Sequence, residues 1–257
     1  MSDFDRNYAA ARGGYGADRA VAIDAGLRAY MIRVYNYMAA AVALSGAVAW
    51  LAYQAAGGAN IVVSGGTMTG LTAFGSTLLS GPAMIVLMLA TLGLVFFLSF
   101  RIQTLQFGTA LMLFMIYAAL LGLTLAPIFL AYTGASITRV FFISAAAFGA
   151  LSLYGYTTKR DLSPFGTFLI MGLIGIIIAS LVNIFLASSA LEFVISVVGV
   201  IVFAGLTAWD TQKIKEMYDV NDDGTVSGRK AVMGALSLYL DFINLFLMLL
   251  RLFGDRR

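Results

Sequence analysis

Long uncharged, apolar stretches dominate the chain. No charged residue lies between Arg33 and Arg101, between Arg101 and Arg139, or between Arg139 and Lys159. One crossing of a bilayer needs about 20 apolar residues. The pattern therefore predicts membrane-spanning helices.

The same pattern places seven spans and a polar tail. The spans are expected at residues 30–53, 82–100, 104–126, 138–157, 164–187, 194–217 and 231–253. Because no internal repeat is evident, we expect one seven-span membrane domain over residues 30–254, after a tail of residues 1–29. Residues 54–81, rich in Gly, Ser and Thr, are expected to form a flexible loop outside the cytoplasm. The predicted fold class is an all-α integral membrane protein.

Prolines fall at the edges of these segments. Pro82 and Pro164 begin spans, where proline loses no hydrogen bond within the helix, and Pro127 ends one. Their positions favour the proposed boundaries.

Composition agrees with a membrane protein and narrows its chemistry. Hydrophobic residues make up 61% of the 257 residues and charged residues 11%, against about a quarter charged in soluble proteins. The chain has no cysteine and no histidine, which excludes disulfides, thiolate metal sites and histidine bases. Without a catalytic triad or phosphate-binding loop, we expect neither an enzyme nor a cofactor. Proton-dependent behaviour would have to rest on carboxylates, tyrosines or lysines.

The basic residues lie beside the spans, so they indicate topology and not nucleic-acid binding. The tail with Arg33 contributes five of them, and among the outside loops only Arg139 is basic. This asymmetry predicts a cytoplasmic amino terminus. Seven full spans would place Arg251, Arg256 and Arg257 outside, against the rule, whereas a last segment that enters and returns would keep them inside. The sequence leaves both possibilities open.

Two acidic residues, Asp210 and Asp241, fall deep within predicted spans. Asp210 lies about 12 Å and Asp241 about 15 Å from the connection between the last two spans, at 1.5 Å per residue. In antiparallel neighbours the two would lie at similar depth. Because ionised carboxylates are costly within a bilayer, both are candidate site residues.

Polar side chains accompany each aspartate. Thr207 and Thr211 are spaced to share a face with Asp210, and Ser237 and Asn244 do so with Asp241. Such stripes, among leucine, phenylalanine and methionine, predict a wet or hydrogen-bonded seam between the two spans.

Two neighbouring carboxyl groups with little water resist double ionisation and exchange protons in linked steps. They could therefore sense pH without histidine. When deprotonated, the pair would offer the hard oxygen ligands that Ca²⁺ prefers. The alternative is that Asp210 and Asp241 only join two helices through hydrogen bonds.

Two segments resemble the signature regions of the Bax inhibitor family, also called the transmembrane Bax inhibitor motif family. They are AWDTQKIKEMY, with Asp210, and ALSLYLDFINLFLMLLRLFG, with Asp241, and the order of segments is similar from Leu27 to Gly254. The resemblance implies a central last helix wrapped by six others, and a pH-sensitive calcium leak across a bacterial inner membrane. Calcium ions, protons and the lipid bilayer would be its partners, with Asp210 and Asp241 as sensor and ion site.

The family resemblance also suggests an arginine latch on the aspartates. Arg101, in FFLSFRIQ, matches it by context, but it could equally be a topology anchor. Rival functions are a membrane regulator that binds another protein, such as a protease or death-pathway component, and a proton-coupled exchanger that uses the same acids.

Two further acidic features have simpler interpretations. Asp219, Asn221 and Asp223 fit the first half of an EF-hand loop, but Lys230 stands where a bidentate glutamate is needed, so we expect a charged turn. Glu192, at the start of the sixth span, could line an entrance or stabilise a helix amino terminus.

Overall fold

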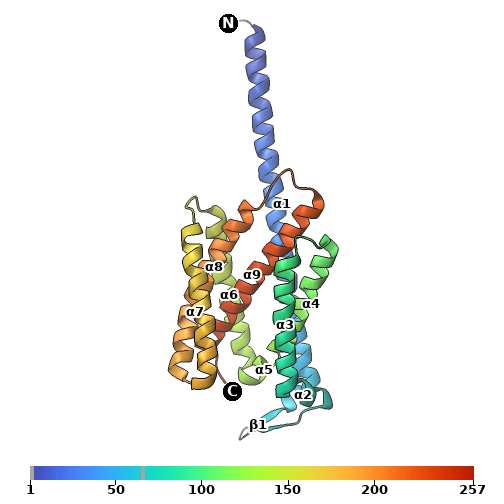
Figure 1. Cartoon of the computed structure of the whole chain (residues 1–257), viewed down its shortest axis with the longest axis vertical. Helices are drawn as coiled ribbons and strands as arrows, with labels where there is room; N and C mark the ends of the chain where they lie inside the picture. The colour runs from blue at the N-terminus through green and yellow to red at the C-terminus, as the bar shows by residue number, and fades with distance from the viewer. Residues whose placement is uncertain (1–2, 65–66) are drawn as a thin grey trace.

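The computed structural model describes residues 3–64 and 67–257, with side chains for residues 24–63 and 67–257. Seven helices in this part are long and apolar enough to cross a membrane. Figure 1 shows them as a bundle of upright helices, from which the first helix projects at its amino-terminal end. The predicted all-α membrane fold is confirmed.

The elements follow one another along the chain with short connections. The long helices are α1 (Asp3–Ala56), α3 (Gly81–Arg101), α4 (Phe107–Leu125), α6 (Gly134–Thr157), α7 (Ser163–Leu186), α8 (Ser189–Glu216) and α9 (Gly224–Phe253). The short elements are η1 (Gly58–Asn60), β1 (Val62–Ser64), β2 (Thr67–Thr69), α2 (Ala73–Leu78) and α5 (Ile128–Ala131). Within α1, residues 24–56, whose side chains the structure describes, qualify as a span.

Helix starts agree with local sequence signals. Pro82 and Pro164 lie in the first turns of α3 and α7, as predicted. The side chain of Ser188 accepts a hydrogen bond from the Leu191 amide at 3.3 Å and caps α8. Such caps satisfy amides that the helix leaves free.

The last helix, α9, is the core of the bundle. In its most apolar window 72% of residues are buried, against 11–39% in the other six spans. α1, α4, α6 and α8 pack on it directly, whereas α3 packs on α4 and α7 packs on α8. The last helix is central, as expected, and the six other spans surround it in two shells. Four helices pack on α9, and two pack outside these four.

Small residues allow the helices to approach closely, as is common in membranes. A Cβ atom at Gly122 of α4 would lie 2.6 Å from the Ser45 carbonyl oxygen of α1. A Cβ atom at Gly155 of α6 would collide with the Ala208 carbonyl of α8. Larger side chains at either glycine would push the helix pair apart.

Residues 54–81, expected to be a loop, carry regular structure. β1 and β2 pair antiparallel, with Val62 opposite Thr69. Thr72 caps α2 by accepting from the Gly75 amide at 3.0 Å, and its own amide donates to Ala56 at 3.0 Å. A stretch without charges can fold when caps and turns satisfy its backbone.

α9 crosses the bundle completely. It is one helix of 30 residues, about 45 Å long, and it ends opposite the amino terminus (Figure 1). An uninterrupted helix of this length favours a full last span over a segment that enters and returns. We call this the C-terminal end of the bundle; the hairpin of β1 and β2 lies there too.

Two of the basic residues at the C-terminal end have acidic partners. Arg256 lies 2.9 Å from Glu192, and Arg139 lies 2.8 Å from Asp255. The Thr133 amide also donates to the Asp255 carbonyl at 3.1 Å. The ion pair with Glu192 offsets the charge of Arg256, one of the basic residues that argued from sequence against a full last span.

Candidate functional site

Asp210 and Asp241 meet between α8 and α9. These two helices pack closely and run in opposite directions from the turn between Met217 and Asp223. The two carboxyl groups are close enough to interact with each other across this contact. The equal depth expected from helix rise is therefore present in the fold.

The environment of Asp241 is almost dry. The residue is 4% exposed. Its Oδ2 atom is buried and has no hydrogen-bond partner in the described part of the chain. Ionised carboxylates only accept hydrogen bonds, so a bond between two carboxyl groups requires one shared proton. The second oxygen of Asp241 remains able to accept a proton, a water molecule or a cation.

The nearest positive charge that acts on Asp210 is that of Lys213, one turn further along α8. The Lys213 ammonium lies 4.9 Å from the centre of the Trp209 ring and is exposed. Arg101 is also exposed, at the end of α3 in the outer shell, and has no ion pair with the side chains described here. The arginine latch remains a prediction, since this arrangement does not bring Arg101 to the pair.

The predicted threonine stripe faces another helix. The Thr211 hydroxyl lies 2.9 Å from the Ser152 hydroxyl of α6, which lies 2.7 Å from the Tyr35 hydroxyl of α1. Thr207 donates to the Phe203 carbonyl at 2.8 Å. This hydroxyl chain joins three helices beside the carboxyl pair and does not enclose it.

Sequence reasoning missed Ser152 and Tyr35. A signal for the serine was present, because Ser136, Ser144 and Ser152 recur every eight residues on α6 and all three are buried. No comparable spacing marks Tyr35.

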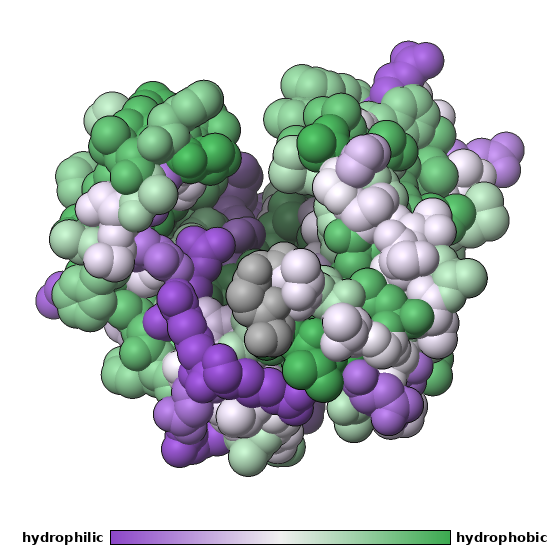
Figure 2. All heavy atoms as spheres, turned by 90° about the horizontal axis from the view of Figure 1, so that it is seen from below, coloured by the Kyte–Doolittle hydropathy of each residue, from purple (hydrophilic) through white to green (hydrophobic). Residues whose placement is uncertain are grey.

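The α9 stripe leads from the pair to a cavity. Asn244, one turn beyond Asp241, lines a cavity of about 660 Å³ between α7, α8 and α9, together with Glu192 and Arg251. Ser237, on the other side of Asp241, is half-buried. The cavity belongs to the C-terminal end, where Figure 2 shows a hollow between two apolar lobes with hydrophilic atoms on its wall.

Glu192 combines both interpretations offered by the sequence. It lies in the first turn of α8, where a negative charge is favourable, and it lines the cavity. Its ion pair with Arg256 holds it at the rim.

The carboxyl pair alone supplies too few oxygen atoms to complete the coordination of Ca²⁺. Within the described residues no group of three acidic, histidine or cysteine side chains could hold a metal. Ca²⁺ takes six to eight oxygen ligands, and two carboxylates supply at most four. Water or backbone carbonyls would have to supply the remaining ligands of a bound Ca²⁺.

The loop between α8 and α9 forms a charged turn, and its acids have local partners. Asp223 caps α9 by accepting from the Val226 amide at 2.7 Å, and Lys230 pairs with Asp222 at 2.6 Å. The Asn221 amide donates to Asp219 and lowers the pKa of that carboxyl group. These side chains face the turn itself, which agrees with the EF-hand-like pattern being incidental.

Comparison with known proteins assigns the chain to a family. Residues 27–257 match the family described as "Inhibitor of apoptosis-promoting Bax1". Inner membrane protein YbhL of Escherichia coli K12 is 49% identical over 243 residues, covering 94% of this chain and 97% of that protein. Protein RP147 of Rickettsia prowazekii is 48% identical over 234 residues, covering 91% and 92%. A protein of Caulobacter vibrioides is 43% identical over 261 residues, covering the whole of both chains. The chain therefore belongs to the Bax inhibitor family of membrane proteins.

Proposed function

We propose that this protein is a pH-sensitive calcium leak channel or transporter in which Asp210 and Asp241 sense protons and contact the ion. The observation that carries the proposal is the close approach of two carboxyl groups among the spans, one of which has a buried oxygen without a partner in the described part of the chain. Charged groups in the bilayer interior are costly and usually serve ion or proton pathways.

A cavity lies between the level of the pair and one end of the bundle. Asn244, one turn along α9 from Asp241, lines it together with Glu192 and Arg251, whereas neither aspartate does. Deprotonation would place two negative charges side by side, and a divalent cation would offset their repulsion. Protonation would remove that attraction.

The proposal also includes the membrane in which the protein lies and the orientation of its amino terminus. A relative that shares 49% identity is named as an inner membrane protein. Most basic residues near the span ends lie at the end of the bundle that carries the amino terminus, which favours that end in the cytoplasm. The C-terminal cavity would then open on the opposite side of the inner membrane.

Calcium flux into sealed vesicles containing the purified protein tests the proposal. We expect flux that changes with pH in the natural protein and that loses most of its pH dependence in Asp241→Asn and Asp210→Asn, because linked titration needs two carboxyl groups. Asp161→Asn, which alters an exposed acid in the α6–α7 turn, is the matched control and should behave like the natural protein.

Two results would contradict the proposal. Unchanged pH profiles in both aspartate variants would remove the sensor role from this pair. Absence of calcium flux from well-folded, correctly inserted protein would favour a regulator that acts through another membrane protein.

A further inference from the structure

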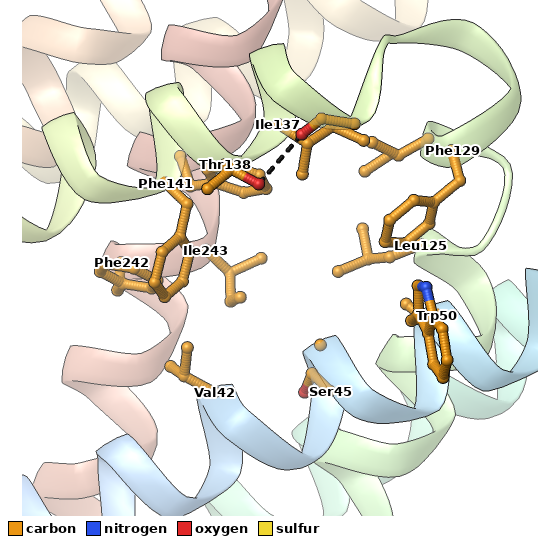
Figure 3. A pocket seen from close by; sticks show the side chains of 15 residues that line it. Val42, Ser45, Trp50, Leu125, Phe129, Ile137, Thr138, Phe141, Phe242 and Ile243 are labelled. Atoms are coloured by element: carbon orange, nitrogen blue, oxygen red, sulfur yellow. Dashed lines mark hydrogen bonds between the residues drawn. The ribbon is translucent and has the colours of Figure 1, made fainter.

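A second cavity lies between α1 and α6 in the C-terminal half of the bundle. Its volume is about 430 Å³. In Figure 3, Trp50 of α1 and Phe129 of α5 lie on one side of it, and Phe141 of α6 lies on the other side with Phe242 and Ile243 of α9. None of the residues that line the cavity beside Asn244 also line this one.

The lining of this cavity is uncharged, and its hydroxyl groups are already bonded. Ser45 lies 2.7 Å from the Ala118 carbonyl oxygen, and Thr138 donates to the Gly134 carbonyl at 3.0 Å, the dashed line in Figure 3. A water molecule in a cavity needs two to four polar partners. The site therefore suits an apolar occupant and not water or an ion.

The cavity opens on the outer surface of two spans. Gly46 and Trp50 of α1 and Thr138 of α6 are all exposed, although each lies within a helix that crosses the membrane. Exposed surfaces of spans face lipid, and tryptophan is frequent near the membrane interface. Bilayer hydrocarbon is consequently the most abundant apolar material at the opening.

We propose that this cavity binds one acyl chain of a bilayer lipid. Its volume lies within the range of about 300–1,000 Å³ that is typical of small-molecule sites. An unfilled apolar cavity of this size weakens packing because its wall loses contacts. A hydrocarbon chain restores those contacts and requires no polar partner.

The bound chain contacts the central helix. Phe242, Ile243 and Phe246 of α9 contribute to the lining, directly after Asp241. On the α1 side, Ser45 is hydrogen-bonded to Tyr239 at 2.6 Å. The lipid thus supports the segment that carries the buried aspartate, whatever function that aspartate has.

Tryptophan fluorescence tests the site directly. The chain has two tryptophans, so Trp209→Phe leaves Trp50 as the only one. The full chain, stripped of lipid in detergent, is titrated with a phosphatidylcholine whose acyl chains carry bromine, which quenches nearby tryptophan. We expect quenching that saturates near one lipid per protein. A second titration uses a brominated free fatty acid in place of the phospholipid.

Substitutions at glycines test whether the lipid chain lies in this cavity. A Cβ atom at Gly46, which lines the cavity, meets open space, and so does one at Gly93 on the lipid-facing side of α3. Gly46→Phe fills the cavity and should raise the half-saturating lipid concentration at least about tenfold, which corresponds to about 1.4 kcal/mol. Gly93→Phe should leave it unchanged. If Gly46→Phe does not fold, Gly134→Leu fills the cavity from α6, since its Cβ also meets open space.

Three outcomes would overturn the proposal. Quenching that rises without saturation, equally in all variants, would mean surface contact with detergent-bound lipid only. Saturable quenching unaffected by Gly46→Phe and Gly134→Leu would place the chain elsewhere. Saturable quenching by the fatty acid but not by the phospholipid would identify a different occupant.

Discussion

The hydroxyl of Tyr239 on α9 lies 2.6 Å from the hydroxyl of Ser45 on α1, and both residues are buried. Tyr239 also packs edge-on against Phe114 and Tyr117 of α4. Three spans are therefore fixed at one point, two residues before Asp241.

Tyr239→Phe should separate the hydrogen bond from the packing. It keeps the ring and should lower the free energy of unfolding by about 1 kcal/mol, the usual contribution of one buried hydrogen bond. Tyr239→Ala also creates a cavity and should cost about 3–5 kcal/mol. Thermal unfolding in one detergent measures both, and equal losses would show that the ring packing contributes little.

Lys213 acts on Asp210, whereas Arg101 lies away from the aspartate pair. Replacing each residue with Gln should therefore affect the pH dependence of calcium flux differently. Lys213→Gln removes a positive charge beside Asp210, so the pH midpoint of calcium flux should rise. Since Lys213 is exposed, the shift should stay below about one pH unit.

Arg101→Gln is the companion experiment. If Arg101 only anchors topology in the cytoplasm, Arg101→Lys and Arg101→Gln should both keep the natural pH profile once insertion is verified. A rise in flux at neutral to alkaline pH in Arg101→Gln, reversed only partly by lysine, would support the latch, because lysine lacks the bidentate fork.

The turn between α8 and α9 should matter for folding and little for ion flux. Asp223→Ala removes the α9 cap and should cost about 1 kcal/mol of stability, whereas Asp223→Asn keeps a capping oxygen. Asp219→Asn combined with Asp223→Asn should therefore leave both stability and calcium flux nearly unchanged. Loss of flux in that double variant at every salt concentration would move the ion site to the turn.

The sequence predicted the features that depend on local pattern. The spans follow from uninterrupted apolar stretches, and the shared depth of Asp210 and Asp241 follows from helix rise on either side of one turn. Prolines marked helix starts because their missing amide hydrogen has no cost there.

Features that depend on which helices touch could not be predicted this way. Helical spacing placed Thr211 on a face with Asp210, but only the packing of α6 shows that the Ser152 hydroxyl is its hydrogen-bond partner. The position of Arg101 depends on α3 lying outside α4, which single-helix periodicity does not encode. The cavity near Trp50 is a gap between helices and has no signature in the chain.

The direction of α9 can be tested with thiol labelling, because the natural chain has no cysteine. Asp24→Cys lies at the start of the first span, and Arg257→Cys lies at the opposite end of the bundle, which is also the end of the hairpin that holds Met68. In intact cells we expect a membrane-impermeant maleimide to label Arg257→Cys and Met68→Cys but to reach Asp24→Cys only after the inner membrane is opened. This follows from a fully spanning α9 and a cytoplasmic amino terminus.

Labelling of Arg257→Cys together with Asp24→Cys, and apart from Met68→Cys, would mean that the last helix turns back within the membrane. Inverted labelling of all three would keep the full span and reverse the orientation.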